Sequence, residues 1–272
     1  MNRKPWIKIS LFLLLFSSGI VLMVAARKFE RERVMKDPNI IVHVEGSEAF
    51  LNQKEILDRL VRARLITPRL RSQELKPRSI ETTLTSMEEI KTAQVYQGIG
   101  GSWVIEVWLR NPIARIFTEN GQSFYLDSDG FIISKAEFHT ARVLVISGNI
   151  NEPLKGQNVP QIINNPSLKN NRKLDDFYRI SNYVCKDSVL QPLIGQVYLD
   201  KTGDFVLVPI VGDQKIVFGS AETEEEVENK FTRLKVFYQE VMPFEGWEKY
   251  EEINVKYEGQ IVGRKRGATE SK

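Results

Sequence analysis

The sequence has few of the residues that build disulfide or metal-bound scaffolds. Its 272 residues include one cysteine, Cys185, and two histidines, His43 and His139. A single cysteine can form neither an intrachain disulfide nor a cysteine zinc cluster. The histidines fall in segments predicted as strand and loop, with no metal-ligand spacing between them. We interpret both as ordinary structural or surface residues, and expect no metal and no cofactor.

The sequence also lacks the specific signatures of catalysis. It contains no G-x-S-x-G elbow, no GKS or GKT phosphate loop, no HExxH and no CxxC. The glycine-rich stretch at 98–101 lies between two predicted strands, with Trp103 where a dinucleotide loop needs its third glycine. It therefore predicts a turn. A catalytic pair of carboxylates remains an open alternative, because acidic residues are plentiful. The absence of every specific catalytic signature favours a binding or scaffold protein over an enzyme.

The stretch YLDSDGFIIS, residues 125–134, resembles the start of a calcium loop. If Gly130 were the sixth position of such a loop, Tyr125 and Ala136 would stand at the first and twelfth, where carboxylates are required. Asp and Gly between two short apolar runs are instead typical of a hairpin turn. We predict a turn that binds no metal.

Positive charge is concentrated at the start of the chain. Residues 1–37 hold eight Lys or Arg and three Asp or Glu, whereas the other 235 residues hold 30 basic and 32 acidic side chains. Nucleic-acid binding depends on basic surfaces that contact phosphates. The charge of residues 38–272 thus gives no support to a nucleic-acid partner.

The one long apolar run is Ile9–Ala26, eighteen residues without a charge. At ~1.5 Å per residue this run nearly crosses a hydrocarbon core of about 30 Å, so it predicts a retained transmembrane helix. The alternative is a cleaved signal peptide, because Val24-Ala25-Ala26 has cleavage-site spacing. Basic residues flank the run on both sides, so charge alone does not fix its orientation.

The remaining pattern predicts an α+β protein in two parts. After a charged segment at 27–37, predicted as a helical extension or linker, comes a β-α-α-β-β unit in which Asn52 and Glu55 form a capping box. The second part is β-rich and has two amphipathic helices. Its strands are predicted at 113–117, 123–126, 130–134, 141–147, 194–200, 205–211, 215–219, 250–257 and 260–265, and its helices at 172–186 and 223–242.

This order of elements resembles the FtsQ/DivIB family of bacterial cell-division proteins. Residues 110–114, RNPIA, match the family's junction between its two domains, although Leu109 stands where Glu is usual. Phe124, Asp127 and Gly130 match the aromatic residue and the Asp-x-x-Gly turn that follow. Near the end, NVKY at 254–257 replaces the family's Asp-Leu-Arg-Tyr and keeps only the tyrosine, which implies a distant branch.

The resemblance implies a single-pass protein of the cell inner membrane, with its N-terminus in the cytoplasm and its C-terminal part periplasmic. It implies a non-enzymatic divisome scaffold that binds FtsB-like and FtsL-like proteins and recruits the septal peptidoglycan synthesis machinery. The corresponding segments are a cytoplasmic tail (1–8), a transmembrane helix (9–26), a juxtamembrane linker (27–37), a POTRA-like domain (38–111), a β domain (112–266) and a disordered tail (267–272).

The resemblance also implies that the last strands bind the partner. Ile253, Val255 and Tyr257 alternate with polar residues, and a final strand commonly lies at a sheet edge, where an extended segment can add. Tyr257 is the expected anchor, with Tyr250 and Trp247 as weaker candidates; the alternative is that Tyr257 belongs to the core. The expected partner-binding residues are Tyr250, Ile253, Val255, Tyr257, Gln260, Ile261 and Val262.

Two other functions stay open at this stage. One is a POTRA-bearing component of translocation or outer-membrane assembly, which would need a barrel or several POTRA repeats, and neither is visible in the sequence. The other is a membrane-anchored cell-wall enzyme that uses acidic residues of the β domain.

Overall fold

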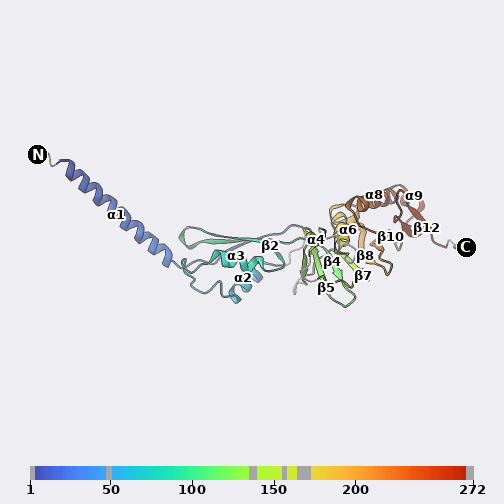
Figure 1. The fold of residues 1–272 in the computed structure, drawn as a ribbon, viewed down its shortest axis with the longest axis horizontal. Helices are drawn as coiled ribbons and strands as arrows, with labels where there is room; N and C mark the ends of the chain where they lie inside the picture. Colours follow the sequence, from blue (N-terminus) through green and yellow to red (C-terminus); the bar gives the residue numbers. More distant parts are fainter. Residues whose placement is uncertain (1–3, 47–50, 135–139, 155–157, 164–172, 268–272) are drawn as a thin grey trace. The chain divides into compact units, whose positions relative to one another are not determined.

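A computed structural model describes residues 4–46, 51–134, 140–154, 158–163 and 173–267 (Figure 1). The described chain begins with helix α1, Lys4–Glu32, and divides into two compact units, the first of which includes this helix. The first unit comprises residues 1–43 and 51–109, and the second comprises residues 44–50 and 110–272. The predicted α+β class, with an N-terminal apolar helix and a large β-sheet domain, is confirmed.

Helix α1 contains the predicted apolar span. Within it, Leu11–Glu32 is long and apolar enough to cross a membrane, and its apolar side chains are exposed. The helix continues through the first part of the segment predicted as a linker and ends at Glu32. After the helix, Val34 forms an isolated β-bridge with Arg71, and Met35 is buried in the core of the first unit. The end of this segment is therefore part of the folded unit.

The first unit is a three-stranded sheet with two helices packed against it. Its elements run β1 (Asn39–His43), α2 (Gln53–Arg62), α3 (Pro77–Thr85), β2 (Ile90–Gln97) and β3 (Trp103–Leu109). The strand order is β1-β3-β2, with β1 parallel and β2 antiparallel to β3. The predicted capping box begins α2, because the Asn52 side chain accepts a hydrogen bond from the Glu55 N–H and the Glu55 side chain accepts one from the Asn52 N–H.

The glycine-rich stretch forms the turn between β2 and β3. Its short helix η1 spans Ile99–Gly101, and Gly100 and Gly101 have φ angles of 73° and 78°. Glycine reaches this left-handed region without a Cβ clash. The stretch is followed by a strand, not by the helix that a dinucleotide loop would open, so the predicted turn is confirmed.

In the described part of the second unit, nine strands form one sheet in the order β12-β11-β10-β9-β8-β7-β4-β5-β6. The strands are β4 (Pro112–Phe117), β5 (Ser123–Asp127), β6 (Ile132–Ser134), β7 (Leu144–Gly148), β8 (Ile194–Leu199), β9 (Phe205–Pro209), β10 (Lys215–Gly219), β11 (Tyr250–Asn254) and β12 (Val262–Lys265). The described helices are α4 (Val159–Ile163), α6 (Leu174–Lys186), α7 (Leu190–Leu193), α8 (Glu224–Glu240) and α9 (Met242–Glu245).

The two predicted helices of this unit, α6 and α8, pack together against the sheet. The α6 ring of Phe177 meets the β9 ring of Phe205 edge-on, with 5.8 Å between ring centroids. The α8 ring of Phe231 packs between Phe218 of β10 and Tyr183 of α6, at 4.8 and 5.0 Å. Aromatic pairs at these separations stabilise a core beyond the area that they bury. This core fixes α8 beside the C-terminal strands.

The last strands are shorter than the sequence predicts. The strand predicted at 250–257 ends at Asn254, because its parallel pairing with β10 ends where Asn254 meets Val217. One further backbone hydrogen bond joins the Val255 N–H to the Val217 oxygen. The strand predicted at 260–265 begins only at Val262. Tyr257 consequently lies in the connection between β11 and β12.

Candidate partner-binding edge

The strand β12 is an open edge of the large sheet. It pairs antiparallel with β11, with Ile253 opposite Gly263 and Asn254 opposite Val262, and the described strand order ends there. At the opposite end of the sheet, an isolated bridge between Phe131 and Asn158 adjoins β6. An edge strand presents backbone N–H and C=O groups to any extended segment that can pair with them. The sheet edge formed by β12 is therefore the candidate site.

The predicted partner-binding residues divide into buried and exposed groups. Tyr250, Ile253 and Val255 are buried in the core, so their side chains support the edge from inside. Tyr257 is 54% exposed and Val262 is 51% exposed, while Gln260 is exposed and Ile261 is partly buried. The interpretation of Tyr257 as a core residue is wrong.

Tyr250 fixes the edge strand to the core. Its ring meets Phe237 of α8 edge-on, with 5.2 Å between centroids, and it also lies against Gly263 in β12. A Cβ added at Gly263 would lie 2.6 Å from the Tyr250 ring, so only glycine allows this approach without a shift. Tyr250 therefore contributes to the site by positioning β12.

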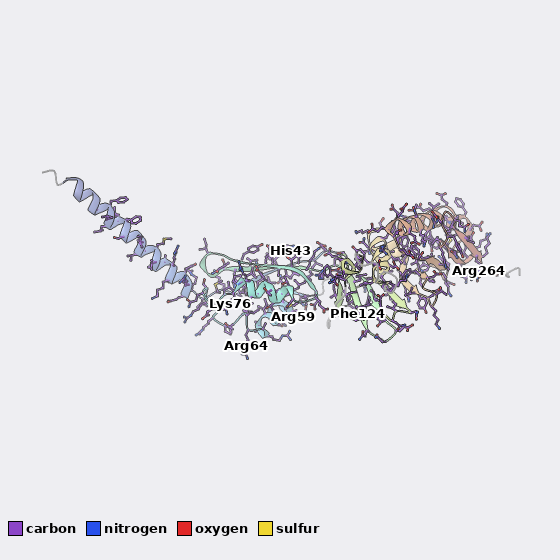
Figure 2. The ribbon with its side chains drawn as sticks, in the orientation of Figure 1. His43, Arg59, Arg64, Lys76, Phe124 and Arg264 are labelled. Atoms are coloured by element: carbon purple, nitrogen blue, oxygen red, sulfur yellow. The ribbon has the colours of Figure 1, made fainter. Side chains whose placement is uncertain are left out.

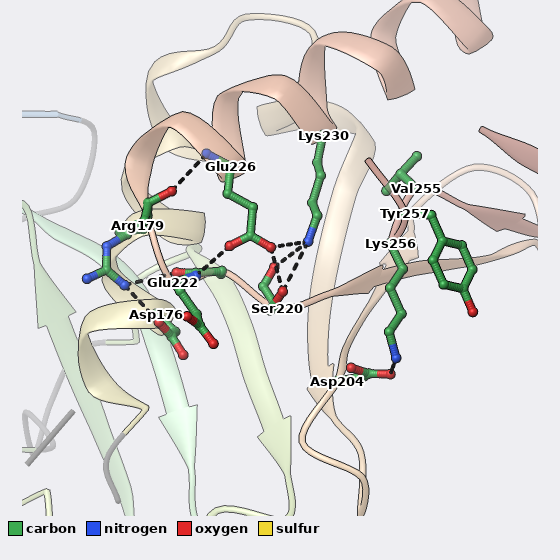
Figure 3. A network of polar contacts seen from close by, with 12 residues as sticks. Asp176, Arg179, Asp204, Ser220, Glu222, Glu226, Lys230, Val255, Lys256 and Tyr257 are labelled. Atoms are coloured by element: carbon green, nitrogen blue, oxygen red, sulfur yellow. Dashed lines mark hydrogen bonds and ion pairs between the residues drawn. The ribbon is translucent and has the colours of Figure 1, made fainter. Parts of the chain in front are cut away.

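The segment that carries Tyr257 is held by two basic residues, Arg233 and Lys256; Figure 3 labels Lys256 with its partner Asp204. The Arg233 guanidinium on α8 donates from Nη2 to the backbone oxygens of Val255 and Tyr257, at 3.0 and 3.2 Å. Lys256 donates from Nζ to Asp204, which raises the pKa of Lys256 through that hydrogen bond and the carboxylate charge. These contacts fix the backbone while leaving the tyrosine ring accessible. Sequence analysis did not single out either basic residue, because each acts on a segment distant in the chain.

Helix α8 itself begins in a polar network, drawn in Figure 3. The Thr223 hydroxyl accepts from the Glu226 N–H, and the Glu226 carboxylate accepts from Ser220, the Glu222 N–H and the Lys230 ammonium group. Burial acts to raise the pKa of Glu226, but the hydrogen bonds outweigh it and leave that pKa below its usual value. Lys230 is only 3% exposed, so this pair anchors the first turns of the helix that carries Arg233.

The edge strand and the residue after it carry arginines that form ion pairs. Arg264 of β12, labelled in Figure 2, forms ion pairs with Glu251 and Glu252 of β11 at 2.7 and 3.2 Å. Arg266 pairs with Asp213 at 3.2 Å. Charged side chains on an edge strand oppose indiscriminate pairing with other strands. A partner at β12 must therefore match these charges.

The turn at 127–130 is held by a cluster of hydrogen bonds and lies outside the candidate edge. The buried Asp127 carboxylate accepts hydrogen bonds from the Asp129 and Phe131 N–H groups, at 3.0 and 2.7 Å, and from Arg110 at 2.8 Å. Burial raises the pKa of Asp127, and these hydrogen bonds oppose that shift. The hairpin between β5 and β6 is confirmed, and both oxygens of its buried carboxylate already have donors. The absence of metal binding stays a prediction.

Comparison with known proteins decides the family. The model of the FtsQ/DivIB, C-terminal related family matches residues 111–264, more than half of the chain. The chain belongs to this FtsQ/DivIB family. The match spans the large sheet from β4 into β12 and includes α8 and the Tyr257 segment, and the family predicted from the sequence is confirmed. No curated protein matches the chain.

Family membership indicates a role in cell division, together with other division proteins. Helix α1 is a candidate single-pass membrane anchor, which is consistent with this family.

Proposed function

We propose that this protein is a non-enzymatic scaffold of the divisome. It captures an FtsB-like partner at β12, acts together with an FtsL-like protein, and recruits the septal peptidoglycan synthesis machinery. The observation that carries the proposal is the open β12 edge beside the exposed Tyr257 ring, inside the segment matched by the family model.

The proposed binding mode is strand addition. An extended partner segment would pair with the backbone of β12, since main-chain hydrogen bonds supply affinity in this mode and side-chain contacts supply specificity. The exposed residues Tyr257, Gln260 and Val262 supply these contacts, with the partly buried Ile261. The buried Tyr250, Ile253 and Val255 keep the edge in place.

The proposed location is the inner membrane. Helix α1 spans it once, with the N-terminus in the cytoplasm and the chain after α1 in the periplasm. The first unit, with its β-α-α-β-β order, serves as a POTRA-like docking module. The combination of one apolar helix with a family of division proteins supports this arrangement.

Removal of the Tyr257 ring tests the proposal. The full-length chain carrying Tyr257→Ala is co-expressed with an FtsB-like protein and recovered from membranes, and the co-purified partner is quantified. We expect at least a tenfold loss of partner, because tyrosine is enriched among the few interface residues that carry most of the binding energy. Thermal unfolding should change little, because the ring is exposed.

The matched control is Tyr198→Ala, since Tyr198 of β8 is a similarly exposed tyrosine of the same sheet, away from the β12 edge. It should retain the partner. Undiminished capture by the Tyr257→Ala chain would refute the proposed site.

A further inference from the structure

The first unit carries a dense group of arginines next to the end of α1. Residues 27–37 and 62–78 together contain eleven Lys or Arg and four Asp or Glu, although the net charge of the whole chain is only +3. Arg64, labelled in Figure 2, is exposed, as are Arg69 and Arg71. Within the described chain, no ion pair or side-chain hydrogen bond is recorded for these three guanidinium groups. We call them the arginine collar.

Backbone hydrogen bonds hold one member of the collar, Arg71, beside the segment that leaves α1. The Met35 N–H donates to the Leu70 oxygen at 2.8 Å, the Ser72 N–H to the Arg33 oxygen at 2.9 Å, and the Gln73 N–H to the Arg31 oxygen at 3.1 Å. Residues 70–73 therefore run next to residues 31–35 as a short ladder. Arg71 itself is the bridge partner of Val34.

This contact sets the height of Arg71 above a bilayer. Glu32, the end of α1, lies six positions after Ala26, the end of the apolar run. A helix rises ~1.5 Å per residue, so Glu32 lies about 9 Å beyond the hydrocarbon boundary if α1 spans the membrane. The headgroup layer is roughly 5–8 Å thick, and charges act over a Debye length of about 8–10 Å. Arg71 is thus within electrostatic reach of the headgroups, and Arg69 lies two positions from it in the chain.

Two collar arginines occupy backbone positions that favour another residue. Arg64 follows the end of α2 with φ of 57°, and the Leu65 N–H donates to the Leu60 oxygen, which is the helix-end motif that prefers glycine. Arg69 has φ of 60° after Pro68, in a turn closed by the Leu70 N–H and the Thr67 oxygen. The third residue of such a turn is usually Gly or Asn. The local backbone conformation favours glycine at both positions and does not account for arginine. The positive charge of the two side chains is the property that distinguishes them from glycine.

From these observations we infer that the arginine collar binds the anionic lipid headgroups of the membrane that α1 spans. The inference rests on the proposed membrane anchoring and is independent of partner capture at β12. Each basic residue near an anionic surface contributes roughly a fivefold preference, so three arginines contribute about a hundredfold. The contact would dock the first unit on the membrane surface.

Fluorescence quenching in lipid nanodiscs tests the inference with the full-length chain. Thr67 is exposed between Arg64 and Arg69, so Thr67→Cys in a Cys185→Ser background carries one dye at the collar. Spin-labelled headgroups act as the quencher. We expect quenching to be at least twofold greater in discs containing phosphatidylglycerol than in pure phosphatidylcholine, and the difference to disappear at high salt, because salt screens exposed charges.

The test variant is Arg64→Gly combined with Arg69→Gly and Arg71→Gln. It should lose the lipid dependence and keep its thermal stability, because glycine suits the first two positions. The matched control removes three exposed lysines of the second unit, by Lys186→Gln, Lys201→Gln and Lys215→Gln, and should keep the dependence. Equal quenching in both lipids, or a test variant that behaves like the wild type, would overturn the inference.

The two proposals fail in different ways. If α1 does not anchor the chain, the protein will not enter the nanodiscs at all. If only the collar inference is wrong, the chain will enter the discs and capture its partner, and quenching will be independent of lipid charge.

Discussion

Burial disfavours the charged form of Asp176. Its carboxylate on α6 is nearly buried and contacts Lys173 at 3.0 Å and Arg179 at 2.7 Å. Burial nevertheless prevails over both cations and raises the pKa of Asp176 to about 6. The folded protein therefore holds a proton on this group in a pH range where an unfolded chain, with an Asp pKa near 3.9, has released it.

This shift predicts a pH dependence of stability. Between about pH 4 and 6 the folded state binds more protons than the unfolded state, so the contribution of Asp176 is greatest below pH 4 and declines until pH 6. Relative to an Asp176→Asn chain, the wild-type free energy of unfolding should fall by roughly 2–3 kcal/mol from pH 4 to 7. Denaturant unfolding of both chains at several pH values measures this. A difference that grew with pH would mean that the ion pairs dominate.

Single residues were predicted well where their role is local. The Asp127 turn followed from Asp and Gly between apolar runs, because turn geometry depends on a few adjacent residues. The reach of Arg110 to the Asp127 carboxylate was not predicted, since it joins residues seventeen positions apart. The sequence also left open whether Tyr257 is an exposed anchor or a core residue. The alternation in residues 253–257 fits a continued strand, but the pairing with β10 ends first.

At the scale of elements, α8 supports the connection between β11 and β12. Arg233 is the link, because one guanidinium nitrogen donates to the carbonyl oxygens of Val255 and Tyr257. Arg233→Met keeps much of the aliphatic stem and removes both donors. We expect a several-fold loss of the FtsB-like partner, with the free energy of unfolding lowered by about 1–2 kcal/mol, since each hydrogen bond contributes roughly 1 kcal/mol.

Co-purification and denaturant unfolding of the Arg233→Met chain measure these two effects. The control is Lys235→Met on the same helix, because Lys235 pairs instead with Asp187 of the segment after α6. Equal partner loss in both chains would show that general destabilisation, and not the connection before β12, accounts for the effect.

The elements that were predicted correctly have strong local signals. The capping box of α2 and the Thr223 cap of α8 are each specified within four residues. The sheet order was not predictable from one sequence, because β7 pairs with β4, so that β4 and β5 separate β6 from β7, two strands that a simple meander would join. The β12 strand was predicted as the last element, but its short length depends on pairing with β11.

At the scale of the whole molecule, the proposed arrangement requires α1 to remain in the mature chain. A phosphatase that is active only outside the cytoplasm, fused after Lys272, should be active, and the fusion should stay in the membrane fraction. The physical reason is the uncharged run Ile9–Ala26, which is long enough to span the hydrocarbon core. Soluble mature protein beginning near Arg27 would instead establish a cleaved signal peptide.

The central claim is that a partner adds as a strand at β12, and backbone hydrogen exchange tests it most directly. The full-length chain is compared with and without a bound FtsB-like protein, and exchange is followed at residues 260–265. Strand addition pairs the outward-facing amides of β12, so their exchange should slow by at least tenfold, while interior strands such as β8 should not change. Unchanged exchange at 260–265 in a complex that remains assembled would contradict the proposed binding mode.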